Sequence, residues 1–180
     1  MIVTPTALPE VLVLEPRVFG DDRGFFFESW NARSFEKAGI AAHFVQDNHS
    51  RSRRSVVRGL HYQIEHAQGK LVRVASGEVY DVVVDLRRSS PHFGRSVGVV
   101  LSEQNRKMMW VPPGFAHGFL TLSESADFLY KTTDYWFPEH ERTLLWNDPV
   151  LGIEWPLVGA PVLAPKDAAG TPFAKADCYA

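Results

Sequence analysis

Three polar side chains lie within segments whose apolar residues alternate as they do in β-strands: His61 in VVRGLHYQ, Lys70 in KLVRVAS and Tyr130 in ADFLYKTT. Alternation places Lys70 on the same strand face as Val72 and Val74, and it predicts that Tyr130 points inwards. Because lysine is almost never fully buried without a partner, a lysine on an inner face favours a cavity that receives an anionic group. Taken singly, His61 and Tyr130 suit hydrogen-bonded core positions and Lys70 suits a solvated edge strand. Together they indicate a lined polar cavity.

Further polar side chains stand beside aromatic or apolar residues elsewhere in the chain. The segments DDRGFFFESW and FVQDNHS contain Arg23, Glu28, Gln46 and Asn48. For residues 21–24 themselves we expect turn chemistry. The rigid turn in PPGFAHGF delivers His117 to the start of another strand, and the alternative is a structural turn with a surface histidine. In APKDAAG, Asp167 lies near the first turn of a short helix, where the helix dipole favours an acidic residue.

The elements that must position these side chains are β-strands. Apolar residues recur with a period of two between clusters of Gly and Pro, which is typical of an all-β domain of short strands. Strands are expected in VLVLEPRV, HFVQDN, VVRGLHYQ, KLVRVAS, EVYDVVVDL, SVGVVL, MMWVP, GFLTL and ADFLYKTT. One helix is expected over residues 31–39, where Asn31 can cap the start and Gly39 the end. The pattern predicts a sandwich or barrel with a few short peripheral helices, and a tail of loops and short turns after Pro156.

Length, composition and charge limit the class of protein. The chain has 180 residues, of which 45% are hydrophobic, and no composition shift, so residues 1–180 are expected to form a single domain. A net charge of −2 gives no general attraction to nucleic acid, and no apolar run approaches the length of a membrane helix. Residues 1–10 lack the features of a signal peptide, so the cytoplasm is the expected compartment. The single cysteine, Cys178, excludes an intrachain disulfide and a cysteine-rich zinc site.

Alternation leaves one conflict in the strand that contains His61. Within VVRGLHYQ, His61 shares a face with Val57 and Gln63, whereas Arg58 falls on the opposite face. Both His61 and Arg58 can line one cavity if the strand bulges at Gly59. Otherwise Arg58 lies at a rim, which a second subunit can share.

Seven segments in chain order carry a more specific signal: FGDDRGFFFES, FVQDNHSRS, VVRGLHYQ, AQGKLVRV, PPGFAHGF, FLYKTTDYW and APKDA. Together they resemble the motifs of the dTDP-4-dehydrorhamnose 3,5-epimerase family, from about Val11 to Asp177. The resemblance implies a cupin-like jelly-roll fold. It also implies an isomerase that acts on a nucleotide sugar in dTDP-L-rhamnose biosynthesis, which supplies cell-surface polysaccharides.

The resemblance further implies a role for each polar side chain. His61 would be the base, oriented by Asp167. Tyr130 would be the acid on the other side of the sugar ring, and Lys70 would stabilise an enolate. These residue types suit the reaction, because removal of a hydrogen beside a ketone near neutral pH needs a positioned base and a cation at the developing enolate oxygen. The substrate-binding positions that the resemblance implies are Arg23, Glu28, Gln46, Asn48, Arg58, His117, Glu141 and Lys166.

The implied reaction is epimerisation at C3 and C5 of dTDP-4-dehydro-6-deoxy-D-glucose, which gives dTDP-4-dehydro-L-rhamnose without a cofactor or a metal. Close alternatives are a dTDP-4-keto-sugar 3-epimerase and a 3,4-ketoisomerase, since both use enolate chemistry. A metal-dependent cupin oxygenase would need a second histidine where Gln63 stands. A non-catalytic sugar-nucleotide-binding module is a further alternative. The many short strands, together with an apolar N-terminal strand in VLVLEPRV that can complete a neighbour's sheet, predict a homodimer.

Overall fold

Short β-strands dominate the structure, which is a computed structural model that describes residues 1–180. The strands are β1 (Ile2–Pro5), β2 (Leu12–Glu15), β3 (Val18–Asp21), β4 (Gly24–Phe27), β5 (Gln46–Arg53), β6 (Val57–Gln63), β7 (Lys70–Ser76), β8 (Glu78–Asp85), β9 (Ser96–Ser102), β10 (Met108–Val111), β11 (Phe115–Thr121), β12 (Ser125–Thr132) and β13 (Glu141–Thr143). The helices are α1 (Ala32–Lys37), α2 (Pro165–Ala168) and the 3-10 helix η1 (Phe173–Lys175).

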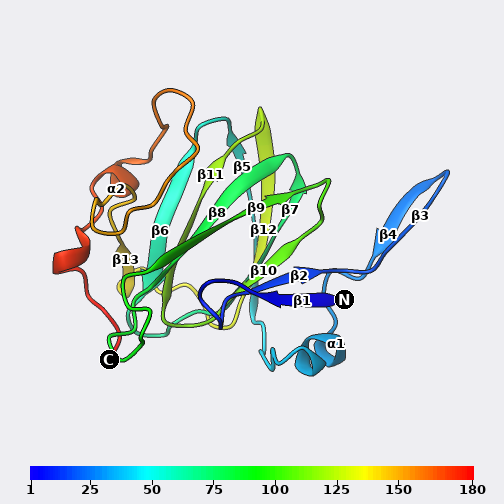
Figure 1. Ribbon diagram of the computed structural model, residues 1–180, viewed down its shortest axis with the longest axis horizontal. Coiled ribbons are helices and arrows are strands. Elements are labelled where there is room, and N and C mark those ends of the chain that lie inside the picture. Colours follow the sequence, from blue (N-terminus) through cyan, green and yellow to red (C-terminus); the bar gives the residue numbers. More distant parts are fainter.

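Two antiparallel sheets face each other and form the body of the molecule (Figure 1). One sheet has six strands in the order β1-β2-β10-β7-β12-β5, and the other has five in the order β13-β6-β11-β8-β9. Most neighbouring strands are far apart in the sequence, as in a jelly roll. The prediction of an all-β jelly-roll sandwich with a few short peripheral helices is therefore confirmed.

Alternation along β8 and its neighbours builds the interior between the sheets. Val79 and Val83 of β8 pack there with Phe119 of β11 and Phe128 of β12. Since the side-chain period of a strand is two, Asp81 lies on the same inner face as Val79 and Val83, and it is fully buried. The apolar residues of these strands thus exclude water around a carboxylate.

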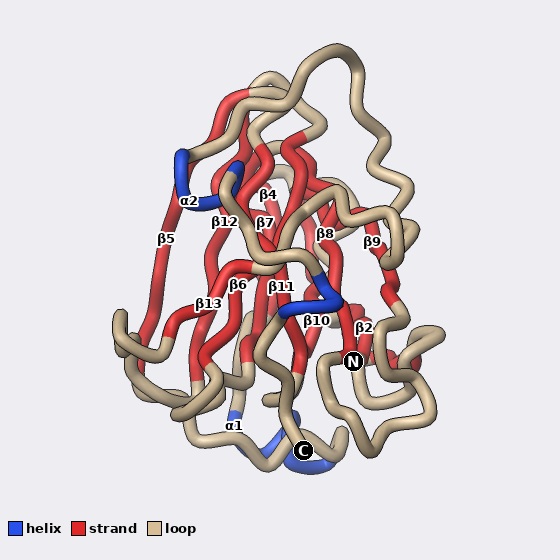
Figure 2. Tube along the Cα trace, turned by 90° about the vertical axis from the view of Figure 1, so that its left-hand side faces the viewer, coloured by secondary structure: helices blue, strands red, loops and turns tan.

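The C-terminal tail covers the outer face of the five-stranded sheet (Figure 2). Ala176 of the tail packs there in one apolar cluster with Leu60 of β6 and with Leu151, which precedes the tail. A parallel bridge between Val56 and Val162 fixes the start of this tail beside β6. The prediction of loops and short turns packed on the sandwich after Pro156 is confirmed, and the tail brings α2 close to β6.

The predicted helix around residues 31–39 is also confirmed as α1. The Asn31 side chain caps it by accepting a hydrogen bond from the Ser34 backbone N–H at 3.2 Å. Phe35 is buried, and Gly39 follows the helix with a φ of 84°. None of the helices combines the length and the apolar character that crossing a membrane requires.

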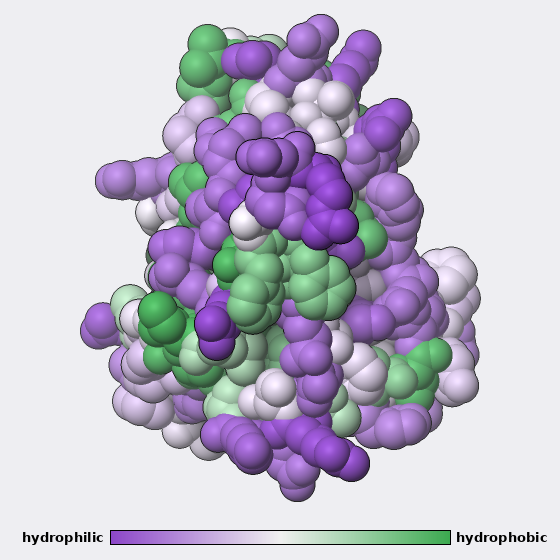
Figure 3. Space-filling model, turned by 90° about the vertical axis from the view of Figure 1, so that its right-hand side faces the viewer, coloured by the Kyte–Doolittle hydropathy of each residue, from purple (hydrophilic) through white to green (hydrophobic).

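A hairpin of β3 and β4 projects from the body of the molecule (Figure 1). Its turn lies at residues 21–24, where turn chemistry was expected. Phe25 and Phe26 of the hairpin are 59% and 69% exposed. Figure 3 views the molecule from this side and shows apolar side chains gathered near the middle of the face. Arg106 packs over the Phe25 ring at 4.3 Å, so the chain itself covers this aromatic surface only in part.

The expected role of the N-terminal strand in VLVLEPRV needs correction. Its ordered part, β2, pairs with β1 on one side and with β10 on the other, both within the same chain. Both backbone edges of β2 are occupied, so this strand does not complete a neighbour's sheet. The outer edge of β1, which pairs only with β2, and the projecting β3–β4 hairpin are N-terminal elements that a second subunit can contact.

Candidate active site

A cavity of about 430 Å³ opens between the two sheets. Its walls combine side chains from β5, β6, β7, β11, β12 and β13 with residues of α2. Ten of the twelve predicted site residues line it: Gln46, Asn48, Arg58, His61, Lys70, His117, Tyr130, Glu141, Lys166 and Asp167. The fold thus brings together side chains that are spread over most of the sequence.

The shortest polar contact in the cavity joins His61 of β6 to Asp167 of α2. The Nε2 atom of His61 lies 2.5 Å from Oδ1 of Asp167, and the Asp167 side chain is only 3% exposed. A carboxylate accepts the N–H of the imidazole, so the other ring nitrogen carries the lone pair. The pair has the geometry of a base whose tautomer is fixed by a buried acid.

Lys70 lies on the inner face of β7, as alternation predicted. It is 8% exposed, and its ammonium group donates a hydrogen bond to the backbone carbonyl of His61 at 3.3 Å. Burial lowers the Lys70 pKa to about 8, although the negative charge of Asp81 opposes this shift. The cavity therefore holds a cation that is poorly hydrated and close to the histidine base.

A second buried histidine–carboxylate pair stands behind this lysine. His117 Nε2 lies 2.8 Å from Oδ1 of Asp81, while Oδ2 of Asp81 has no hydrogen-bond partner. Burial raises the Asp81 pKa, and the charges of His117 and Lys70 act against that shift. His117 is 7% exposed, so the interpretation of a surface histidine is wrong. The sequence reading missed Asp81, although an aspartate at an inward position of the strand EVYDVVVD was the available signal.

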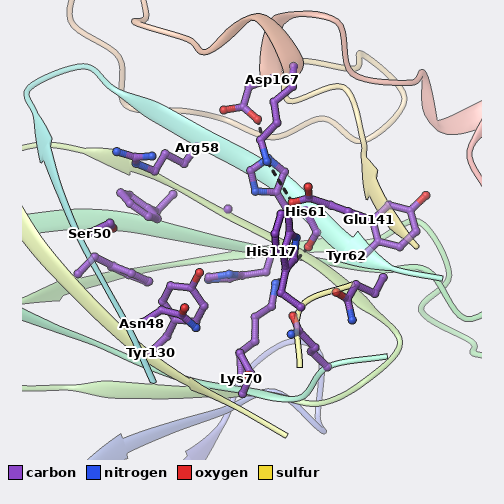
Figure 4. A pocket seen from close by; sticks show the side chains of 18 of the residues that line it. Asn48, Ser50, Arg58, His61, Tyr62, Lys70, His117, Tyr130, Glu141 and Asp167 are labelled. Atoms are coloured by element: carbon purple, nitrogen blue, oxygen red, sulfur yellow. Dashed lines mark hydrogen bonds and ion pairs between the residues drawn. The ribbon is translucent and has the colours of Figure 1, made fainter. Parts of the chain in front are cut away.

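Tyr130 faces the cavity from the opposite sheet. It lies on β12 and packs beside Phe128, with the two ring centroids 6.1 Å apart. Burial raises the Tyr130 pKa, so the hydroxyl stays protonated and can donate a proton or a hydrogen bond. Figure 4 shows Asp167 and His61 on one side of the cavity and Tyr130 on the other. The inward orientation predicted for Tyr130 is confirmed.

Arg58 and His61 line the same cavity because β6 is irregular between them. His117 of β11 pairs with His61, whereas Phe119 pairs with Arg58, so three residue steps on β6 face two on β11. Gly59 has a φ of 118°, and a Cβ atom there would lie 2.6 Å from the Gly118 Cα. The expectation that Arg58 faces away from His61 is therefore wrong, and the alternative of a bulge at Gly59 is confirmed.

Further polar groups surround the cavity. The ammonium group of Lys166 lies 3.0 Å from a carboxylate oxygen of Glu141, and Gln46 donates to the Asn48 side-chain oxygen at 2.9 Å. The Asn48 amide nitrogen is buried and has no partner in the chain. A buried donor without a partner is rare in proteins, so this group is suited to a bound acceptor.

Arg23 and Glu28 do not line the cavity of their own chain. The Arg23 side chain is 90% exposed in the turn of the projecting hairpin and pairs with Asp21. Glu28 follows the hairpin, where it accepts a hydrogen bond from the Asn31 amide at 2.9 Å. Arg23 therefore belongs to the projecting hairpin, whereas Glu28 lies between the hairpin and α1, where the Ser34 hydroxyl also donates to it.

Two acid–base pairs, His61–Asp167 and Lys166–Glu141, line the cavity together with the cations Arg58 and Lys70. No group of three or more His, Cys, Asp or Glu side chains has the arrangement of a metal site. At the position where a cupin oxygenase would have a second histidine, the Gln63 amide is engaged by backbone groups. These acidic and basic side chains suit proton transfer to and from a ligand that carries negative charge.

Comparison with known proteins agrees with this geometry. The family model of dTDP-4-dehydrorhamnose 3,5-epimerase matches residues 5–175. The enzyme of that name from Pseudomonas aeruginosa is 64% identical over 180 residues, which cover 99% of this chain and 99% of the relative. The one from Salmonella typhimurium is 60% identical over 171 residues, with coverages of 94% and 93%.

A solved structure leads to the same result. The dTDP-6-deoxy-D-glucose-3,5-epimerase of Legionella pneumophila, in complex with dTDP-4-keto-L-rhamnose, matches with a TM-score of 0.96 and 51% identity. The match covers 98% of this chain and 94% of that chain. The chain therefore belongs to the dTDP-4-dehydrorhamnose 3,5-epimerase family.

Proposed function

We propose that this chain inverts C3 and C5 of dTDP-4-dehydro-6-deoxy-D-glucose by proton transfer across the cavity, and that it acts in the cytoplasm as one domain of residues 1–180. C3 and C5 both neighbour the ketone at C4. Removal of the hydrogen from either carbon therefore gives an enolate whose negative charge lies on the same oxygen. The observation that carries this proposal is the placement of His61 and Tyr130 on opposite sheets, with Lys70 in the cavity that they share.

His61 is the base in this mechanism. Its lone pair accepts the proton from the carbon beside the ketone, and the electrons of the broken C–H bond pass to the carbonyl oxygen. Asp167, at 2.5 Å from the ring, keeps the tautomer in place and stabilises the imidazolium that forms. Exchange with solvent then restores the neutral imidazole before the second carbon reacts.

Lys70 stabilises the enolate oxygen. The negative charge that develops there is far better stabilised by a buried ammonium group than by water, because the surroundings screen little. Asp81, which is buried near Lys70, helps to keep the ammonium group protonated, since its charge raises the Lys70 pKa against the effect of burial. His117 in turn holds the Asp81 carboxylate at 2.8 Å.

Tyr130 gives its own hydroxyl proton to the carbon from the other face of the ring, and the phenolate that remains regains a proton from solvent before the second carbon reacts. The hydroxyl is neutral at working pH because burial raises its pKa. Donation from the face opposite to His61 inverts the carbon, whereas donation from the His61 side would restore the starting configuration. The two sheets of the sandwich thus separate the acid from the base.

The remaining polar side chains bind the nucleotide part of the substrate. Arg58, whose Nε donates to Ser52 at 2.9 Å, presents a guanidinium group to a diphosphate. Neutral and paired groups can then hold the sugar hydroxyls and the base: Gln46, Asn48, Glu141 and Lys166. Because guanidinium and diphosphate are both weakly affected by pH near neutrality, binding depends less on pH than proton abstraction does.

Arg23 and Glu28 act in this proposal through a homodimer. Arg23 lies in the turn of the projecting hairpin and Glu28 directly follows the hairpin, whose exposed Phe25 and Phe26 give a second subunit an apolar surface to cover. In such a dimer the hairpin of one subunit reaches the cavity mouth of the other, and Arg23 adds a second cation for the diphosphate. This arrangement accounts for two site residues that lie far from the cavity of their own chain.

Incubation with dTDP-4-dehydro-6-deoxy-D-glucose, followed by NMR of the product, tests the proposal. Inversion at both C3 and C5 supports it. Inversion at C3 alone would assign the chain as a 3-epimerase, and a ketone moved to C3 would assign it as a ketoisomerase. Binding without turnover would leave a sugar-nucleotide-binding module.

A further inference from the structure

Gln63 is a buried amide at the end of the strand that carries His61. It is 3% exposed, and none of the steps described above uses it. Its side-chain oxygen accepts a hydrogen bond from the Phe137 backbone N–H at 2.7 Å. Its side-chain nitrogen donates to the His66 carbonyl at 2.7 Å and to the Tyr135 carbonyl at 3.2 Å. One amide therefore ties β6 to the loop between β12 and β13.

That loop has no strand or helix to satisfy its backbone over residues 134–137. Side-chain oxygens accept the hydrogen bonds of this loop backbone instead. The N–H groups of three consecutive residues each donate to a side-chain oxygen: Tyr135 to Asp134 at 2.8 Å, Trp136 to Gln46 at 3.2 Å, and Phe137 to Gln63 at 2.7 Å. The first two of these hydrogen bonds are exposed, whereas the one from Phe137 is partly buried, so the Phe137 N–H depends most on its side-chain acceptor.

Gln63 differs from the other two acceptors in its burial and in its number of contacts. Gln46 is only partly buried, and Asp134 belongs to the loop itself. Gln63 is anchored in the sheet and contacts both sides of Trp136, through the Tyr135 carbonyl and the Phe137 N–H. It shares the Tyr135 carbonyl with Gln68, whose side-chain nitrogen donates to it at 3.1 Å, and it is the side-chain acceptor for the peptide N–H that follows Trp136.

Trp136 lies at the wall of the cavity. Its side chain belongs to the lining, yet the residue is 56% exposed, so other side chains hold it only in part. The position of the indole ring therefore depends on its backbone. A large flat ring at the mouth of a cavity is suited to packing against a planar or ring-shaped part of a ligand.

We propose that Gln63 is a positioning residue that sets the place of Trp136, and through it the binding of the nucleotide sugar. This inference rests on the proposed function for the identity of the ligand. Gln63 stands two residues from His61, so the same strand fixes the base and the aromatic wall. Loss of Gln63 should then weaken substrate binding and leave proton transfer nearly unchanged.

The test compares Gln63→Leu with Gln104→Leu, a matched change at an exposed glutamine that bonds to Glu103. Gln63→Leu is expected to raise KM about tenfold with kcat within about twofold, and Gln104→Leu to change neither. Calorimetric binding of dTDP should weaken in parallel, which tests the inference even without turnover. An unchanged KM and an unchanged dTDP affinity in Gln63→Leu would overturn it, as would a fall in kcat alone.

A double-mutant cycle with Trp136→Ala separates positioning from general stability. If Gln63 acts through Trp136, the double variant binds dTDP no more weakly than Trp136→Ala does. Additive losses would contradict the inference. Should Gln63→Leu fail to fold, Gln63→Glu provides the same test, because a carboxylate keeps the acceptor for Phe137 but loses both donors. A wild-type chain that binds dTDP but does not turn over would count against the proposed function and leave this inference intact.

Discussion

His61 Nε2 and Asp167 Oδ1 lie 2.5 Å apart, although 106 residues separate them in the sequence. The histidine comes from the bulged strand β6, and the aspartate comes from a four-residue helix in the tail. The base of the proposed mechanism therefore depends on a tail that packs on the outer face of the sheet, so changes in the tail should affect chemistry.

Asp167→Asn is expected to reduce kcat by about 10²- to 10⁴-fold while the chain stays folded. An amide has nearly the same shape as a carboxylate, but it neither selects the tautomer nor stabilises an imidazolium. Steady-state kinetics measure the effect. Asp177→Asn is the matched control, because Asp177 lies on the same tail and pairs with Arg142 away from the cavity. Equal losses in both variants would mean that the tail acts only as packing.

Tyr130→Phe is expected to separate proton removal from inversion. The ring keeps its packing beside Phe128, and the base remains, so hydrogen exchange with solvent at the reacting carbons should persist with retained configuration. Inverted product should fall sharply. NMR of the sugar in deuterated water measures both quantities at once. Normal inversion in this variant would show that another group returns the proton.

Lys70→Met should stabilise the fold and impair catalysis. Burial lowers the Lys70 pKa to about 8 from its usual value of 10.5, so at pH 7 folding buries a charge that water solvates in the unfolded chain. We expect an increase of about 1–3 kcal/mol in the free energy of unfolding at pH 7, measured by denaturant titration. Lys37→Met, at an exposed lysine of α1, is the control. A large loss of stability in Lys70→Met would show that the charge is well compensated.

The same shift gives a pH dependence. The folded chain releases the Lys70 proton at about pH 8, whereas the unfolded chain holds it up to about 10.5. The destabilisation is therefore fully present below pH 8 and is relieved as the pH rises through this window. The value of kcat should fall as the pH rises through the same window, because the mechanism needs the protonated, cationic form of Lys70. A pH profile of kcat that stays flat from 7 to 9.5 would contradict the role of Lys70.

Arg23→Ala tests the shared cavity. In a mixed dimer of Arg23→Ala and His61→Ala chains, the site that keeps His61 would receive an intact Arg23 from its partner. Each mixed dimer should then show about half the activity of the wild-type dimer, although each variant alone is nearly inactive. No recovery on mixing would place Arg23 in its own chain's site. Sedimentation that shows a monomer would contradict the dimer itself.

Much of the fold follows from the alternation of side chains. The register between the strands that carry Lys70 and Tyr130 is regular over residues 70–74 and 128–132, so the inner faces of these stretches could be assigned from the sequence. The β3–β4 hairpin was missed as a pair of strands, because its aromatic residues do not alternate with polar ones and remain exposed. Alternation reports burial in the chain's own core, and the hairpin lies outside that core.

The site was predictable in its residue types and less so in its geometry. The parity rule failed at Arg58, because a bulge at Gly59 shifts the register and no periodicity reveals the shift in advance. Asp81 was visible as a polar residue in an apolar strand, but its partner His117 lies on another strand and becomes evident only when β8 and β11 pair. Distances between residues far apart in sequence come from the packing of whole sheets.

Deuterium incorporation by His61→Ala tests the central claim most directly. In deuterated water the wild-type chain should incorporate deuterium at both C3 and C5, and so should His43→Ala, a change at an exposed histidine. His61→Ala should incorporate deuterium at neither carbon while its thermal unfolding stays cooperative, because no other group on that side of the cavity is proposed to accept the proton. Exchange at the wild-type rate in His61→Ala would contradict the assignment of the base, and His117 would become the residue to test.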